Sequence, residues 1–223
     1  MTKLSRTSLE LFLQCPRCFW LKLHKKAKRP SCPPYTINIA IDLLLKREFD
    51  ECRYNKLEHK LLKKYKIDAR PFNCQEIDRW RHNFTGVQYE DEKNDLLIYG
   101  AVDDVWINSK DQLIVVDYKA TGAKEPKVYD SYKRQMEIYQ WLLKKNRRRV
   151  SPTGYFLFAR ADKDQGFENG KLSFDLTLEP VKGSTSWIPQ AIIAAKKCFD
   201  RRTAPEASGD CEYCKWSEES RKK

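Results

Sequence analysis

The chain has 223 residues and carries 43 Lys and Arg against 31 Asp and Glu, a formal net charge of +12. This length is enough for a full hydrophobic core, and the basic excess favours nucleic acid over a membrane as partner. No apolar run has the length of a transmembrane helix, and the first residues, MTKLSRTSLELFLQC, lack the features of a secretory signal. We therefore expect a cytoplasmic protein, in which cysteines bind metal or pack in the core rather than form disulfides.

The N-terminal part predicts a helix followed by a cysteine pair. Residues 5–13 place leucine and phenylalanine at helical spacing after a Ser/Thr-rich cap. Cys15 and Cys18 follow in the sequence CPRC. Residues 25–34, KKAKRPSCPP, contain too much proline for a regular helix, so we expect an extended connection there.

A long helix is predicted from Ile37 to about Tyr65. Its apolar stripe consists of Ile37, Ile41, Leu44, Leu45 and Cys52. Glu48 falls in the middle of this stripe and Asp42 at its edge. An acidic residue in an apolar stripe needs a partner, either a bound metal or a neighbouring Lys46 or Arg47. On burial Glu48 is the stronger metal-ligand candidate.

The central stretch 100–119, GAVDDVWINSKDQLIVVDYK, predicts two strands joined by a polar turn, after a helix over 71–83 and a strand over 86–90. If the hairpin is symmetric about Lys110, Asp103 lies opposite Asp117, with Cβ atoms about 4.5–5.5 Å apart. The two-residue period also places Lys119 on their face.

Two opposed carboxylates on an apolar face repel each other, and a divalent cation between them removes that penalty. Oxygen ligands suit Mg²⁺ or Mn²⁺. Lys119 would then hold a nucleophilic water or stabilise a developing negative charge. The alternative is an ion pair between Asp117 and Lys119 beside a solvated Asp103.

The rest of the chain predicts a helix, two strands and a last helix. The helix over 129–145 turns Gln135 and Tyr139 the same way. Residues 153–160 read as a buried strand, 171–181 as an edge strand and 188–202 as a helix. Apolar residues on both faces of the central hairpin predict a mixed sheet of about four or five strands covered by helices on both sides.

The sequence closes on a second cysteine pair, Cys211 and Cys214, in CEYC. Together with Cys15 and Cys18, this pair makes a four-thiolate set for Zn²⁺ or an iron–sulfur cluster. The two pairs are too far apart in sequence for a local zinc ribbon, so the site would join the N-terminal helix to the C-terminal segment.

Gly-x-x-Asp, a hydrophobic strand ending in Asp-x-Lys, and Gln-x-x-x-Tyr on the next helix resemble the PD-(D/E)XK nuclease superfamily, and more narrowly its RecB-like exonuclease branch with its CRISPR-associated relatives. The matching residues are Gly100, Asp103, Asp117, Lys119, Gln135 and Tyr139. The resemblance implies a restriction-endonuclease-like fold and a Mg²⁺- or Mn²⁺-dependent DNA nuclease. Asp103 and Asp117 would bind the metal, Lys119 would assist catalysis, and Gln135 and Tyr139 would line the substrate path.

The chain departs from this family at two places. The early-helix Gly-x-x-x-His spacing falls on Asn38 and Asp42, so motif spacing favours Asp42 as a further metal ligand whereas burial favours Glu48. The family's 4Fe–4S cluster is bound by one N-terminal and three C-terminal cysteines. Here Cys18 would supply the fourth ligand. The resemblance favours a 4Fe–4S cluster, and zinc is the alternative because a two-plus-two set suits zinc equally well on spacing.

These patterns together predict a single α/β domain over 1–223, with a nuclease-like core at about 36–181. Segments 1–34 and 184–223 would form the cysteine-bound metal centre. The expected function is an exonuclease acting on single-stranded or end-containing DNA. The alternatives are a catalytically silent DNA-binding or scaffold module and a zinc-stapled RNA-binding protein.

Overall fold

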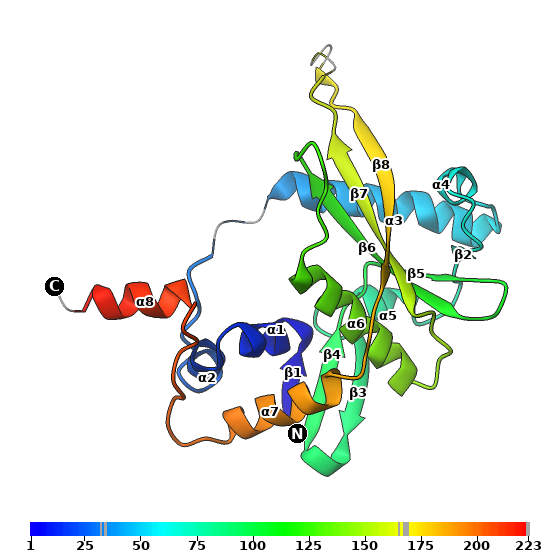
Figure 1. Cartoon of the computed structure of the whole chain (residues 1–223). Coiled ribbons are helices and arrows are strands. Elements are labelled where there is room, and N and C mark those ends of the chain that lie inside the picture. The colour runs from blue at the N-terminus through cyan, green and yellow to red at the C-terminus, as the bar shows by residue number, and fades with distance from the viewer. Residues whose placement is uncertain (32, 34, 165, 167–169, 222–223) are drawn as a thin grey trace. The chain divides into compact units, whose positions relative to one another are not determined.

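The computed structural model describes residues 1–31, 33, 35–164, 166 and 170–221 (Figure 1). The chain divides into two compact units. The cysteine unit comprises residues 1–33, 90–99 and 186–223, and the sheet unit comprises residues 34–89 and 100–185. No helix in the described ranges is long and apolar enough to cross a membrane.

The sheet unit is built on a five-stranded mixed sheet of order β2-β5-β6-β7-β8. The strands are β2 Arg70–Pro71, β5 Asp104–Ile107, β6 Leu113–Thr121, β7 Thr153–Ala161 and β8 Phe174–Lys182. β6 and β7 are parallel and the other neighbours antiparallel. The prediction of a mixed sheet of four or five strands is confirmed.

The register of the central hairpin is also confirmed, although its first strand is shorter than expected. Trp106 pairs with Ile114 and Val105 with Val115, which is the predicted symmetry about Lys110. The expected strand through Gly100 and Asp103 is broken, because β4 (Leu96–Gly100) pairs with β1 and β3 in a separate sheet and β5 begins at Asp104. Asp103 therefore lies at a bend immediately before β5.

Helices cover the two faces of this sheet, α3 (Thr36–Asn55) and α4 (Lys60–Lys64) on one and α6 (Asp130–Lys145) on the other (Figure 1). Phe49 of α3 packs in one core with Trp106 and Tyr118. On the opposite face α6 approaches so closely that a Cβ at Gly154 would lie 2.8 Å from the Val115 carbonyl oxygen and collide with Met136. The alternation of β6 therefore turns Tyr118 toward α3 and its neighbour Asp117 toward α6.

The long helix predicted over 37–65 is two helices, because Lys56 takes a left-handed conformation (φ 56°) that ends α3. The buried stripe of α3 also differs from the predicted one: it consists of Ile41, Leu45, Phe49 and Arg53. These residues recur every four positions, whereas the predicted stripe included Ile37 and Leu44, which are exposed. Glu48 lies beside the buried stripe rather than within it.

Among the described residues, the cysteine unit contains four α-helices and most of a three-stranded sheet of order β1-β4-β3, because residues 87–89 of β3 and Gly100 of β4 belong to the sheet unit. The elements are β1 Thr2–Ser5, α1 Arg6–Gln14, α2 Pro16–His24, β3 Val87–Asp91, the 3-10 turn Glu92–Asn94, β4 Leu96–Gly100, α7 Ile188–Phe199 and α8 Glu212–Glu219. β1 was not predicted, because its four residues read as the cap of α1. Ser5 does cap that helix by accepting a hydrogen bond from the Ser8 N–H.

Candidate active site and four-cysteine centre

Asp117 is the centre of a polar cluster between β6 and α6. Its carboxylate is fully buried. Gln135 Nε2 donates to Asp117 Oδ1 at 2.6 Å and to Tyr139 Oη at 3.2 Å. Lys119 Nζ forms an ion pair with the other carboxylate oxygen, Asp117 Oδ2. The sheet and α6 thus bring together four of the predicted site residues.

Asp103 joins this cluster from the bend before β5. Its Oδ2 accepts a hydrogen bond from the Tyr118 backbone N–H at 2.9 Å. Burial and the negative charge of Asp117 raise the pKa of the Asp103 carboxyl from 3.8 to about 6, against the opposing effect of Lys119 and Lys46. The two acids are therefore close enough for the ionisation of one to disfavour that of the other.

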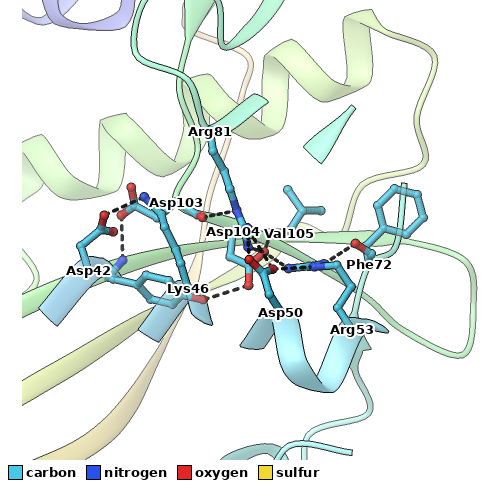
Figure 2. Close-up of polar contacts among 10 residues, drawn as sticks. Asp42, Lys46, Asp50, Arg53, Phe72, Arg81, Asp103, Asp104 and Val105 are labelled. Atoms are coloured by element: carbon cyan, nitrogen blue, oxygen red, sulfur yellow. Dashed lines mark hydrogen bonds and ion pairs between the residues drawn. The ribbon is translucent and has the colours of Figure 1, made fainter. Parts of the chain in front are cut away.

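Asp42 of α3 is the third acid of this group. Burial and the negative charge of Asp103 raise its pKa, and Lys46 Nζ lies 2.7 Å from its Oδ2 (Figure 2). Of the two acids proposed on the early helix, Asp42 is therefore the one that lies beside Asp103, and it is also the one that the motif spacing favoured.

Glu48 has other partners. It pairs with His59 Nε2 at 3.2 Å and with Lys60 Nζ at 3.0 Å, and these two side chains outweigh the effect of burial and lower the pKa of Glu48. Its side chain is 37% exposed. Six residues beyond Asp42 on the same helix, Glu48 is turned by about 120° from it. The structure does not bring Glu48 into the cluster. We expected an acidic residue at this position to need a partner, and the structure provides His59 and Lys60.

The donor set of Asp42, Asp103 and Asp117 fits a hard divalent cation, because all three supply carboxylate oxygens and the pKa values of Asp42 and Asp103 are raised by burial and by neighbouring negative charge. Among the described residues, the three acids do not stand as close together as the four cysteines do. Lys46 and Lys119 instead compensate two of the charges.

A buried charge network supports the backbone of this site (Figure 2). Arg81 donates from Nε to the Asp103 carbonyl oxygen at 3.0 Å and from Nη2 to Asp104 Oδ1 at 2.9 Å. Tyr118 Oη donates to Asp104 Oδ2 at 2.8 Å. Arg53, itself fully buried, pairs with the same Asp104, and Asp50 pairs with both arginines.

Asp104 was not predicted as an important residue. The sequence does indicate that Asp104 is buried, because the two-residue period of the strand places it on the apolar face that it shares with Trp106. A carboxylate there requires buried cations. Arg53 and Arg81 come from two separate helices, and their approach to Asp104 depends on tertiary structure that sequence periodicity does not describe.

We expect Asp104→Asn to lower the free energy of unfolding by about 3–5 kcal/mol, because it leaves two buried guanidinium groups with one carboxylate fewer. Urea denaturation measures this loss. Glu76→Gln is the matched control, since it removes the half-exposed ion pair with Arg148 and should change stability by about 1 kcal/mol or less. Equal effects of the two substitutions would contradict a structural role for the network.

A second prediction concerns the pH dependence of stability. Since the native pKa of Asp103 is raised, wild-type stability falls as pH rises through the interval from about 4 to about 6. Asp103→Asn removes this loss, so the variant should be more stable than wild type at about pH 7 and no more stable at about pH 4. The expected gain at pH 7 is on the order of 1 kcal/mol, because Asp103 is only part-buried and solvent screens its charge. Thermal denaturation without divalent cations tests this, and an advantage at low pH alone would refute it.

The four predicted cysteines meet at one site in the cysteine unit. Cys15, Cys18, Cys211 and Cys214 are buried, and their sulfurs all lie within 4.8 Å of one another. Cys18 Sγ is 3.6 Å from Cys214 Sγ and 3.7 Å from Cys211 Sγ, and Cys15 Sγ is 3.9 Å from Cys214 Sγ. The predicted joining of the N-terminal and C-terminal segments by this centre is confirmed.

The surroundings of Cys15 favour its thiolate form, whereas burial raises the pKa of Cys18 and of Cys214. Backbone N–H groups of Cys18 and Ser208 outweigh the effect of burial and lower the pKa of Cys15 to about 6. Arg29 Nη2 lies 3.4 Å from Cys211 Sγ as a hydrogen-bond donor. Cys198 of α7 lies outside this set of four and donates to the Pro16 carbonyl oxygen at 3.7 Å.

Comparison with solved structures supports this fold. A structure described as "Crystal structure of SSO0001" matches with a TM-score of 0.50 and 15% sequence identity, over 97% of this chain and 84% of that one. A likeness at this identity concerns the fold alone. A search of curated proteins found no match in sequence.

The sequence itself identifies the family. A family model of the PD-(D/E)XK nuclease superfamily matches residues 38–218. The chain belongs to this superfamily, whose members are metal-dependent nucleases. The matched range contains the acidic cluster and the second cysteine pair, and it begins after Cys15 and Cys18.

Proposed function

We propose that the chain is a Mg²⁺- or Mn²⁺-dependent deoxyribonuclease of the RecB-like type, acting as an exonuclease on single-stranded or end-containing DNA. The observation that carries this proposal is the cluster around Asp117, in which a fully buried carboxylate contacts Lys119 and Gln135 and raises the pKa of Asp103. Ionisable groups with perturbed pKa values in one cluster are typical of catalytic sites.

Asp42, Asp103 and Asp117 would hold the metal. A bound Mg²⁺ or Mn²⁺ supplies Lewis-acid chemistry, lowering the pKa of water and screening the scissile phosphate. Gln135 fixes the orientation of Asp117 through its 2.6 Å hydrogen bond. Gln135 and Tyr139 would also guide the strand along α6.

Lys119 acts as a fixed positive charge. Although burial lowers its pKa, Asp117 and Asp103 outweigh this effect and the pKa is raised. Lys119 therefore stays protonated and is unsuited to the role of general base. It would instead hold the attacking water and stabilise the negative charge that develops on the phosphate in the transition state.

The second candidate function is a catalytically silent DNA-binding or scaffold module. Two observations favour it: Asn38 and Asp42 replace the family's glycine and histidine, and among the described residues the three acids do not stand as close together as the four cysteines do. Such a module would bind DNA without hydrolysing it.

Cleavage assays with end-labelled oligonucleotides separate the two. We expect nucleotide release from linear single-stranded DNA in Mg²⁺ or Mn²⁺, inhibition by chelation of the metal, and no cleavage of circular single-stranded DNA. Labels at the 5′ and 3′ ends give the polarity. Binding of the same oligonucleotide without metal-dependent release from any substrate would favour the silent module.

The four-cysteine centre would hold a structural metal. A tetrahedral zinc–thiolate site with Zn–S bonds of 2.3 Å has sulfurs about 3.8 Å apart, and the distances of 3.6–3.9 Å support this choice. A 4Fe–4S cluster, which the family resemblance implies, places each cysteine on a separate iron. Anaerobic purification distinguishes them: a colourless protein with one zinc per chain supports the first, and a brown protein with acid-labile sulfide supports the second.

A further inference from the structure

A large cavity lies within the cysteine unit, beside the four sulfurs. Its volume is about 780 Å³, and its walls come from α2, the segment after it, and α8. This volume is in the range of small-molecule sites. Neither the acidic cluster nor the structural metal accounts for it.

Two aromatic side chains on α8 line the cavity and remain open to solvent. Trp216 is 69% exposed and Tyr213 is 45% exposed. Aromatic rings contribute to stability mainly when they are buried, so an exposed pair on one wall adds little to folding. Open ring faces of this kind are suited to stacking on a planar partner.

The cavity also has a cationic rim. The Arg29 guanidinium lies 4.7 Å from the centroid of the Tyr213 ring, and Lys28 and Arg221 line the same space. Arg17 is a further wall residue, paired with Glu218. The pKa of the part-buried Lys22 is lowered, chiefly by burial and in addition by the positive charge of Lys28. A polyanion would relieve this crowding of positive charge.

The four-cysteine centre fixes the geometry of this wall. Cys18 and Cys214 line the cavity, and Cys214 directly follows Tyr213 in α8. Arg29 contacts the Tyr213 ring and also donates to Cys211 Sγ. The rings and the rim are therefore held in place by the same residues that would bind the metal.

We infer that this cavity is a second nucleic-acid site, in which an unpaired base of single-stranded DNA stacks on Trp216 and Tyr213 while the adjoining phosphates contact Arg29 and Lys28. Aromatic platforms with cationic borders bind single strands without sequence preference, because every base has a π face. The inference rests on the proposed function for the choice of DNA as ligand. It assigns the cysteine unit a role in holding the strand.

Binding is best measured in an Asp117→Asn parent, so that cleavage does not interfere. Fluorescence anisotropy with a labelled oligothymidine of about 16 nucleotides gives the Kd. Trp216→Ala should raise the Kd about 5- to 150-fold, the loss expected for one base–aromatic stack, and Trp216→Phe should retain most of the affinity. Phe84→Ala, which removes an 83% exposed aromatic ring from the sheet unit, should leave the Kd within about twofold of the parent.

Photo-crosslinking with 4-thiothymidine locates the strand directly. We expect crosslinks on the tryptic peptides 203–215 and 216–221, which contain Tyr213 and Trp216. An unchanged Kd for Trp216→Ala, or crosslinks confined to the sheet unit, would overturn the inference. The inference would also be overturned if Trp216→Phe raised the Kd as much as Trp216→Ala while the variant kept its normal zinc or iron content. Because this readout is binding, it is independent of whether the wild-type chain cleaves DNA.

Discussion

Replacing Asp117 by alanine should lower the rate of metal-dependent DNA cleavage by at least about 10³-fold, equivalent to roughly 4 kcal/mol of transition-state stabilisation, while the Kd for single-stranded DNA changes little. Asp117 is the most buried of the three candidate acids, and Lys119 and Gln135 are both oriented by it. Its loss would remove a metal ligand and also release the two side chains that contact it.

Lys119→Met should lower the cleavage rate by about 10²–10³-fold, the effect of removing one preorganised charge or donor. Asp175→Ala is the control for both substitutions, because it removes a half-exposed carboxylate paired with Arg160 in the same unit. Single-turnover cleavage and anisotropy measure rate and affinity separately. Equal losses in the two measurements would indicate a structural role for Asp117 instead of a catalytic one.

The second large effect is expected at the four-cysteine centre. Cys211→Ala should abolish stoichiometric metal binding and make the segment up to Trp20 sensitive to trypsin. Structural zinc sites contribute about 10–16 kcal/mol in small domains, and among the residues that the structure describes, the partly buried apolar side chains packed against these four cysteines are Leu11 and Ala207. The ion pair of Arg17 with Glu218 is a further contact between the first cysteine pair's segment and α8, and it is polar and partly exposed.

Cys74→Ser provides the control, since Cys74 is a part-buried free thiol of the sheet unit. It should keep the metal content and the protease resistance of the wild type. Limited proteolysis with mass spectrometry, together with metal analysis, gives both readouts. A Cys211→Ala protein with full metal content and an intact N-terminal segment would refute the assignment.

Much of the candidate site could be predicted because its residues are related by short-range periodicity. The register of β5 and β6 follows from the turn, and the four-residue spacing of Gln135 and Tyr139 follows from the helix. The expectation that Asp103 lies near Asp117 needed only the register of the hairpin, and the charge of Asp117 does raise the pKa of Asp103 in addition to burial. The four cysteines were predicted by chemistry, since four thiolates in a reducing compartment favour a shared metal.

The errors arose where the fold depends on contacts distant in sequence. The strand through Gly100 was expected to be continuous, but β4 pairs with β1 and so leaves the central hairpin. The stripe of α3 was misassigned because Leu44 and Leu45 are both apolar, and only packing against the sheet decides which is buried. Glu48 was favoured on burial because it falls within this misassigned stripe. Its partners, His59 and Lys60, lie at the start of α4, which the periodicity of the sequence did not separate from α3.

The order in which the chain is synthesised gives the four-cysteine centre a further consequence. Cys18 and Cys211 are separated by 193 residues, so at translation rates of about 5–20 residues per second the first pair waits roughly 10–40 s for the second. During this interval Cys15 and Cys18 are open to oxidants and to stray metal ions. The sheet unit, complete at residue 185, can fold on the ribosome before the centre forms. If the centre binds a metal, its assembly must therefore follow synthesis of the second cysteine pair, and it would depend on the redox state and metal supply of the cell at that moment.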